Sequence, residues 1–163
     1  MQDAAEVLVV VPSHAFRETL VALIDTGVPL RGLAWATKGF DRDTGLLPHQ
    51  IVRSLLGERV PTAVLSGPTF AAEVAAGLPS ALTVASTDSS FARAIARSIA
   101  TETFRAYTSN DVMGVEVGGA TKNVYAIGAG ISDGLGFGAN TRIALVTRGL
   151  RKVSANAQPS IRR

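Results

Sequence analysis

Lys122 stands out among the residues that could take part in chemistry. It lies in a stretch of small and apolar residues, with Gly118, Gly119 and Tyr125 within about one helical turn of it. Lysine is rarely buried without a partner, and burial lowers its pKa towards the range that a general base needs. The alternative is a lysine whose stem lies along the helix while its ammonium group reaches water. The sequence alone favours neither.

A second lysine, Lys38, directly follows an apolar run that predicts a buried strand. A lysine beyond the carboxyl end of a strand can hold an anion or a polar group of a substrate, although a solvated loop lysine is the more common outcome at such a position. The turn Gly67-Pro68-Thr69 follows another predicted strand. Its N–H groups and hydroxyl could bind an anionic or carbonyl oxygen, and simple capping of the next helix explains it as well.

Two histidines and an aspartate are weaker candidates for acid–base work. His14 and His49 lie in polar segments, so we expect both at the surface; His14 is the better candidate for a site because it follows a predicted strand. Asp133 could pair with a base, but its place at a helix end accounts for it equally well. The chain has no cysteine and only these two histidines, which excludes thiolate chemistry and argues against a metal site.

The elements that would position these residues alternate between strand and helix over residues 1–109. Their continuous apolar strands suit burial on both faces, and the order predicts a parallel sheet covered by helices on both sides. Ligands of such sheets gather beyond the carboxyl ends of the strands. The expected strands are 6–11, 33–37, 62–65, 81–85 and 103–107. The expected helices are 16–24, 46–56, 70–76 and 91–100; Pro68 suits the first turn that leads into the third, and Asp88 can cap the fourth.

The pattern changes at Asn110, where a long helix over 112–131 is predicted with Asp111 as its N-cap. Glycine costs roughly 1 kcal/mol in a free helix relative to alanine, so a helix with this many glycines must be held by tertiary packing. Residues 132–134 end it, a glycine-rich loop follows, and Asn140 or Thr141 can cap a last helix that begins near Arg142.

The charge distribution argues against nucleic acid as a partner. The formal net charge is +3, but five basic residues without an accompanying acid lie in the last 16 residues, and removing them leaves −2. No apolar run approaches the roughly 20 residues that span a bilayer, and Asp3 and Glu6 stand where a signal peptide would be basic. These features favour a cytoplasmic protein that is not inserted in a membrane.

Several motifs together resemble the bacterial NAD(P)-dependent glycerol-3-phosphate dehydrogenases. They occur in the order and roughly the spacing of that family, and the last two are long and specific. The matching stretches are Val9–His14 (VVVPSH), Trp35–Gly39 (WATKG), Ser66–Glu73 (SGPTFAAE), Gly77–Ser80 (GLPS), Gly118–Asn123 (GGATKN) and Ala126–Leu150 (AIGAGISDGLGFGANTRIALVTRGL).

The resemblance implies an enzyme that uses NAD or NADP to interconvert sn-glycerol 3-phosphate and dihydroxyacetone phosphate for phospholipid synthesis. By family analogy Lys122 transfers the proton and also binds substrate, and Lys38 contacts both cofactor and substrate. Gly67 and Thr69 match substrate-binding positions, and Ala71 matches a cofactor contact. The implied partner is this small-molecule substrate, and a homodimer of the full-length enzyme is left open.

The implied fold is a partial doubly wound (Rossmann-like) α/β sheet followed by the first helices of an all-α substrate domain. We expect 1–109 to be the C-terminal part of the dinucleotide-binding domain and 110–163 the start of the substrate domain, with 151–163 a divergent tail. The glycine-rich fingerprint of the family, and the residues that separate NAD from NADP, would precede this chain. The alternatives are a non-catalytic remnant of that enzyme and a related hydroxyacid or sugar-phosphate dehydrogenase; the motifs GGATKN and SDGLGFGAN speak against the latter.

Overall fold

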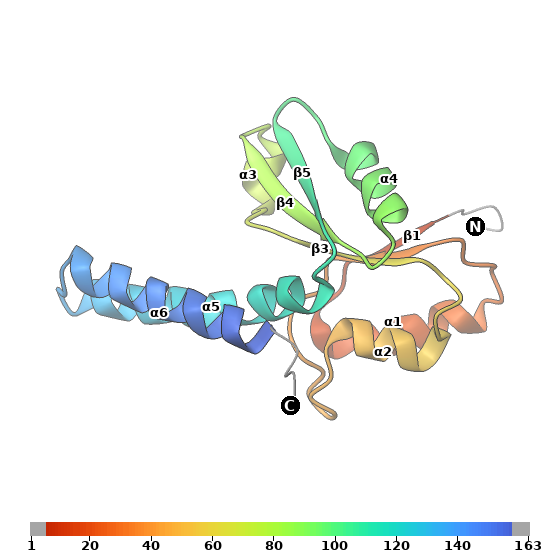
Figure 1. Ribbon diagram of the computed structural model, residues 1–163, viewed down its shortest axis with the longest axis horizontal. Helices are drawn as coiled ribbons and strands as arrows, with labels where there is room; N and C mark the ends of the chain where they lie inside the picture. Colours follow the sequence, from red (N-terminus) through yellow and green to blue (C-terminus); the bar gives the residue numbers. More distant parts are fainter. Residues whose placement is uncertain (1–5, 158–163) are drawn as a thin grey trace.

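A five-stranded sheet with helices on both faces forms the body of the molecule, and a helical hairpin projects from it (Figure 1). The computed structural model describes the backbone of residues 6–157 and the side chains of 6–149 and 151. The predicted tail 151–163 therefore lies largely outside the described residues. The strands are β1 (Val7–Val9), β2 (Leu33–Trp35), β3 (Thr62–Ser66), β4 (Ser80–Ala85) and β5 (Phe104–Ser109), and they lie side by side in that order.

The strand directions correct one expectation. The Rossmann-like α/β class is confirmed, and β1, β2 and β3 are parallel to one another, as are β4 and β5, but β4 runs antiparallel to β3. A parallel return needs a crossover that runs back along the whole strand. The only helix between β3 and β4 is α3 (Ala71–Ala75), which rises only about 7 Å at 1.5 Å per residue. The chain therefore re-enters the sheet in the opposite direction.

The longer helices follow the sequence prediction with small shifts at their ends. Asp88 and Asp111 are N-caps as predicted, since their carboxylates accept the N–H groups of Phe91 and Gly114. Asn140 and Thr141 do not cap the last helix, because it already begins at Ala139 and both residues lie in its first turn. The helices are α1 (Ser13–Asp25), α2 (Pro48–Leu56), α4 (Ser89–Ile99), α5 (Val112–Gly134) and α6 (Ala139–Ala157).

Two apolar cores lie on opposite faces of the sheet. Under α1 and α2, Phe16 and Leu20 pack on Trp35 of β2, and the Phe16 and Trp35 rings are 6.1 Å apart between centroids. Under α4, Phe91 and Ile95 pack on the small residues of β2 and β3 and on Val84. The expectation of strands buried on both faces is wrong for β1, where Leu8 is 51% exposed, and for β5, where Tyr107 is 59% exposed. Helix α4 packs mainly on β3, β4 and β5, so it leaves this face of β1 uncovered.

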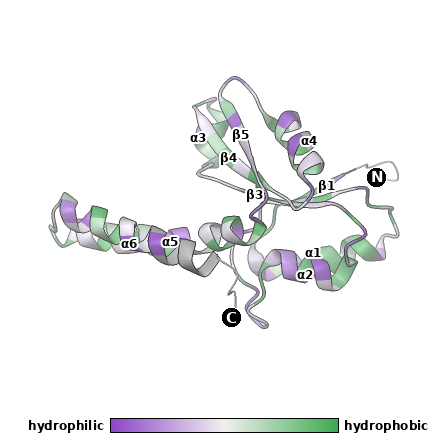
Figure 2. Cartoon of the chain, viewed as in Figure 1, coloured by the Kyte–Doolittle hydropathy of each residue, from purple (hydrophilic) through white to green (hydrophobic). Residues whose placement is uncertain are grey.

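The hairpin of α5 and α6 extends beyond the sheet and contains many hydrophobic residues (Figure 2). Several of their side chains are exposed, among them Val124, Ile127 and Ile143. Tertiary packing holds the first part of α5, where Gly119 is buried. It does not constrain Gly128 or Gly134, since a side chain there would meet nothing within 4 Å among the described residues. In the described part of the chain, none of the helices combines the length and apolar character that a membrane span needs.

Replacing the buried ring in the larger core gives a test of this packing. We expect Phe16→Ala to lower the free energy of unfolding by about 3–5 kcal/mol, because the side chain is 1% exposed and its loss leaves a cavity. Urea denaturation followed by tryptophan fluorescence of Trp35 measures the change. Phe137→Ala removes an equal ring that is 54% exposed, and its cost should stay below about 1 kcal/mol. Equal losses in the two variants would contradict the assigned core.

Candidate active site

The carboxyl ends of β1, β2 and β3 meet at one edge of the sheet, as parallel strands require. A Cβ placed at Gly39, after β2, would lie 3.3 Å from Oγ of Ser13, which begins α1 after β1. Nζ of Lys38 donates a hydrogen bond of 3.1 Å to the carbonyl oxygen of Gly67, which follows β3. Gly39 has a φ of +113°, a conformation that a residue with a side chain would adopt only with strain. The structure thus brings three of the predicted segments together.

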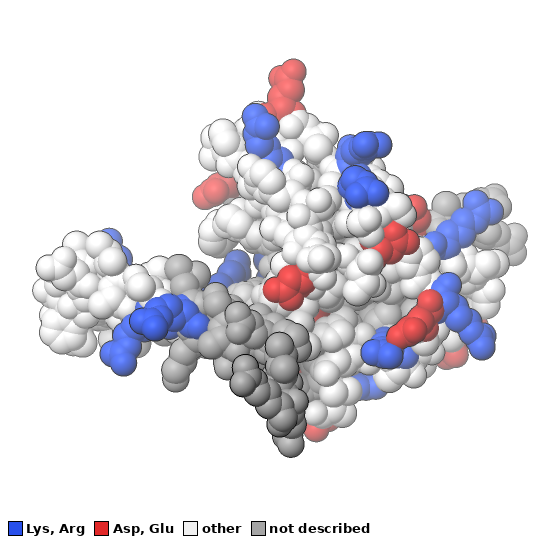
Figure 3. Space-filling view, viewed as in Figure 1, with Lys and Arg blue, Asp and Glu red and all other residues white. Residues whose placement is uncertain are grey.

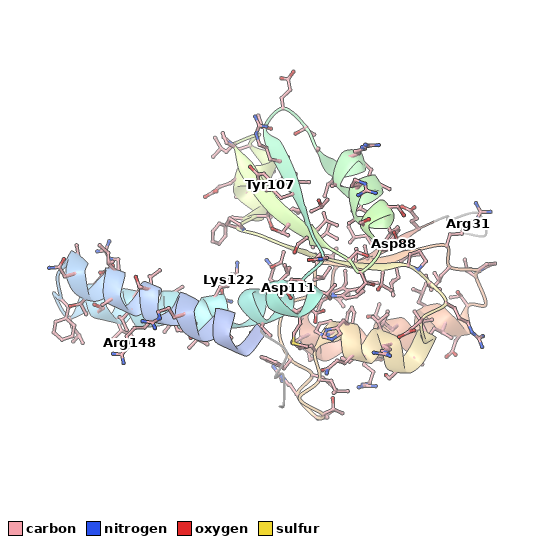
Figure 4. The ribbon with its side chains drawn as sticks, viewed as in Figure 1. Arg31, Asp88, Tyr107, Asp111, Lys122 and Arg148 are labelled. Atoms are coloured by element: carbon pink, nitrogen blue, oxygen red, sulfur yellow. The ribbon has the colours of Figure 1, made fainter. Side chains whose placement is uncertain are left out.

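Helix α5 brings Lys122 to the same edge. Its first turns pack on the core through Val112 and Val115. Gly119 then lies so close to the end of β3 that a Cβ there would be 2.8 Å from Oγ of Ser66 and 3.6 Å from Cγ of Lys38. Lys122 follows one turn later and points from α5 towards the sheet (Figure 4). It lines an open cavity of about 270 Å³ with residues from the end of β3, from β4 and from α5.

Lys122 lines this cavity, and the ammonium group of Lys38 lies beside it, on the carbonyl of the lining residue Gly67. Partial burial, repulsion by the neighbouring Lys122 ammonium and contact with that side chain lower the pKa of Lys38. Lys122 itself is exposed, so the structure shows the alternative in which its ammonium group reaches water. Two adjacent cations, one after β2 and one on α5, suit an anionic ligand or an oxygen on which negative charge develops.

The turn after β3 differs from a simple helix cap. The residue before α3 is Phe70, and the structure gives no side-chain hydrogen bond that caps this helix. Pro68 therefore precedes the helix instead of occupying its first turn, which corrects the sequence prediction. Thr69 is half-buried in the turn and Ala71 is exposed at the start of α3. Among the described hydrogen bonds, this turn is linked to another predicted site residue through the carbonyl of Gly67, which accepts from Lys38.

Of the two histidines predicted to lie at the surface, only His14 does so. His14 is exposed in the first turn of α1. His49 is not at the free surface: its Nδ1 contacts Oε2 of Glu116, and its side chain is 25% exposed. Nothing in the sequence pattern predicts this pair, and its only signal is a single carboxylate among the small and apolar residues of α5. Asp133 pairs with Arg142 at 2.8 Å across the hairpin and not with a base.

Basic and acidic side chains are interspersed over α1, α2 and α4 on the face drawn in Figure 3. The described residues contain no group of three or more His, Cys, Asp and Glu residues arranged to hold a metal ion.

Comparison with known proteins finds two matching family models. Residues 1–92 match the NAD-dependent glycerol-3-phosphate dehydrogenase N-terminus, and residues 111–158 match the C-terminus of the same family. The chain is 56% identical over 156 residues to the glycerol-3-phosphate dehydrogenase [NAD(P)+] of Nitrosococcus oceani, which covers 94% of this chain and 44% of the relative. The corresponding protein of Methylococcus capsulatus is 56% identical over 147 residues, covering 90% of this chain and 44% of the relative.

Solved structures give the same result. The glycerol-3-phosphate dehydrogenase of Coxiella burnetii superposes with a TM-score of 0.82 at 42% identity, covering 93% of this chain and 46% of that chain. The Dunaliella salina structure gives a TM-score of 0.84 at 26% identity, covering 99% of this chain and 28% of that chain. The chain thus spans less than half the length of these relatives.

A methyl group at Gly67 tests the close approach of β3 and β4. A Cβ there would lie 2.5 Å from the carbonyl oxygen of Ala81 and 2.6 Å from Cα of Leu82, so the backbones must separate. We expect Gly67→Ala to lower the free energy of unfolding by about 1–3 kcal/mol. Gly128→Ala is the matched control: it meets nothing within 4 Å and should stabilise α5 by up to about 1 kcal/mol. Unchanged urea midpoints in Gly67→Ala would refute the contact.

The proximity of the two lysines can be measured directly. We expect Lys122→Met to raise the pKa of Lys38, because it removes a neighbouring positive charge, while partial burial keeps that pKa below its ordinary value. The chain has three lysines, Lys38, Lys122 and Lys152, so NMR titration of [13C,15N]lysine-labelled protein follows each one separately. If the titration midpoint of Lys38 is the same in Lys122→Met as in the unchanged chain, the two ammonium groups do not interact.

Proposed function

Because the chain belongs to the NAD-dependent glycerol-3-phosphate dehydrogenase family, we propose that it provides the proton-transfer lysine and one side of the nicotinamide and substrate sites of such an enzyme. The reaction is the interconversion of sn-glycerol 3-phosphate and dihydroxyacetone phosphate. The observation that carries this proposal is the proximity of the Lys122 and Lys38 side chains at the carboxyl edge of the sheet, where Lys122 lines the cavity and Lys38 donates to the carbonyl of Gly67, a lining residue.

Lys122 is the proton-transfer group in this proposal. When the ketone is reduced, negative charge grows on its oxygen, and the Lys122 ammonium stabilises that charge and donates the proton. In the reverse direction the neutral amine accepts the proton of the hydroxyl group. General acid–base catalysis of this kind contributes roughly 10²–10⁴-fold to a rate. The exposed position of the residue at the cavity mouth lets it exchange its proton with water between turnovers.

Lys38 has a different role, because its ammonium group is already held by the carbonyl of Gly67. It supplies a fixed positive charge beside the substrate. An anionic substrate between the two ammonium groups adds two attractions that offset their mutual repulsion, so binding is favoured by the same proximity that lowers the pKa of Lys38. The turn formed by Gly67 and Thr69 adds hydrogen bonds to the substrate in this proposal.

The residues at the edge of the sheet also fit NAD or NADP. A bound nicotinamide supplies the hydride. The N-terminus of α1 has no side-chain cap; the N–H of Ala15 donates to the carbonyl of Pro12, and the N–H groups of Ser13 and His14 have no described hydrogen bond and suit an anionic ligand. Gly39 leaves open the space beside Ser13 that a side chain would fill. Lys38 and Ala71 stay predicted cofactor contacts.

We place the boundary between the two functional parts near Ser109, with residues 1–109 in the dinucleotide-binding part and 110–163 in the substrate part. Supply of glycerol 3-phosphate to phospholipid synthesis, a cytoplasmic location and a homodimer of the full-length enzyme stay predictions.

The second candidate is a chain without activity of its own. The exposed apolar side chains of the α5–α6 hairpin, Val124 and Ile127 among them, favour it for the isolated chain, because such surfaces are normally covered.

The test uses a chimera in which this chain replaces the matching segment of the Nitrosococcus oceani relative. We expect the chimera to oxidise NADH or NADPH with dihydroxyacetone phosphate, and Lys122→Ala to reduce kcat by about 10²–10⁴-fold without loss of helical circular dichroism. Arg97→Ala, an exposed cation on α4, should leave kcat unchanged.

Near-normal turnover of the Lys122→Ala chimera would refute the role of this lysine. The isolated chain is assayed beside the chimera. Turnover in the isolated chain would exclude the second candidate, and its absence beside an active chimera would support it.

A further inference from the structure

Glu116 is a buried carboxylate that the proposed chemistry does not use. Its side chain is 2% exposed and lies on the part of α5 that faces the sheet. Oε1 accepts hydrogen bonds of 3.0 Å from Nε1 of Trp35, on β2, and from the backbone N–H of His49, on α2. Oε2 contacts Nδ1 of His49. One side chain therefore links three elements.

The surroundings of this carboxylate are built to hold it. Burying a charged group is costly unless hydrogen bonds replace its water. Here both oxygens have partners. His49 is the second residue of α2, where the N–H groups have no partner within the helix and the helix dipole favours an anion. Glu116 thus provides a directional attachment, which the apolar contacts of Val112 and Val115 do not.

The attachment matters because of where it lies on α5. The residues that join α5 to the sheet, from Val112 to Gly119, occupy only the first third of a helix of 23 residues, and Lys122 follows directly. Beyond them the described contacts of α5 are mainly with α6, and the hairpin projects away from the sheet (Figure 1). A small pivot of α5 about its first turns would therefore change the separation of Lys122 from Lys38.

We propose that Glu116 is a positioning residue for this reaction: by fixing α5 to β2 and α2, it keeps Gly119 against Ser66 and sets the distance between the Lys122 and Lys38 ammonium groups. The role in the reaction rests on the proposed function of Lys122. The positioning itself does not, because it can be measured without turnover.

The pKa of Lys38 reports the distance, and its direction of change separates two effects. Removing the negative charge of Glu116 would by itself lower the pKa of a lysine, since a carboxylate favours the ammonium form. Releasing α5 would take Lys122 away and raise the pKa of Lys38. A rise in Glu116→Ala therefore has to come from displacement of the helix and cannot come from the lost charge.

The experiment is the NMR titration of [13C,15N]lysine-labelled chain in matched variants. We expect Glu116→Ala to raise the Lys38 midpoint in the same direction as Lys122→Met, although Lys122 is still present. Glu116→Gln should keep the midpoint at or below that of the unchanged chain, because Gln can accept from Trp35 and from the His49 N–H and can donate to Nδ1. Glu102→Ala, which removes an exposed glutamate, should leave it in place.

His49→Ala covers the case in which Glu116→Ala does not fold. It removes only the contact at Oε2 and should give a smaller rise in the pKa of Lys38. If Glu116→Ala folds, an unchanged or lower Lys38 titration midpoint in that variant would overturn the positioning role. If only His49→Ala folds, the same result in His49→Ala would overturn it. A rise in Glu116→Gln as large as in Glu116→Ala would overturn its basis in hydrogen bonding.

The chimera connects positioning to the reaction. We expect Glu116→Ala to lower kcat at least tenfold, and Glu116→Gln to restore most of it. If Lys122→Ala retains turnover, the proposed function fails while the Lys38 titration still decides the positioning. If the titration shows no rise while Lys122→Ala is inactive, only the positioning role fails.

Discussion

The contact of Gly119 with the end of β3 is the constraint on which the site depends. A Cβ at residue 119 would lie 2.8 Å from Oγ of Ser66, so the Ser66 side chain would have to move, and it would also contact the aliphatic stem of Lys38. The contact brings a helix that follows the last strand of the sheet to the carboxyl edge of the first three strands. Without it Lys38 would be a lone cation at a strand end and Lys122 a lone cation on a projecting helix. The proposed chemistry depends on their proximity.

That proximity has a thermodynamic consequence for the unliganded protein. The pKa of Lys38 is lower in the folded state than in the unfolded state, so the folded chain binds fewer protons. The free energy of unfolding therefore rises as the pH increases from the lowered pKa to the ordinary value. Below the lowered pKa the full cost of holding the charged lysine is present. At neutral pH the lysine pair therefore opposes folding, and the two apolar cores must offset it. An anion bound at the cavity would remove that penalty, which makes the site better suited to holding a ligand than to stabilising the fold.

The parts predictable from sequence are those that depend on local pattern. The alternation of strands and helices, the caps at Asp88 and Asp111, and the placement of Lys38 and Gly67 beyond strand ends all follow from neighbouring residues. The antiparallel entry of β4 could not be predicted from the strand itself, since it depends on how far α3 can carry the chain back. The His49–Glu116 pair could not be predicted for a related reason: a histidine expected at the surface meets a buried carboxylate only when distant segments are folded together.

The hairpin shows why the site needs a directional attachment as well as apolar packing. Apolar contacts are tolerant of small rotations, because they are not directional, and the second half of α5 has glycines without close neighbours among the described residues. The Asp133–Arg142 pair joins α5 to α6 and gives the hairpin no hold on the sheet. Within the described chain, a rotation of the hairpin is therefore opposed mainly near the first turns of α5, where a buried carboxylate has donors from two other elements. Hydrogen bonds weaken steeply with misalignment, so this attachment fixes an orientation that packing alone would leave loose.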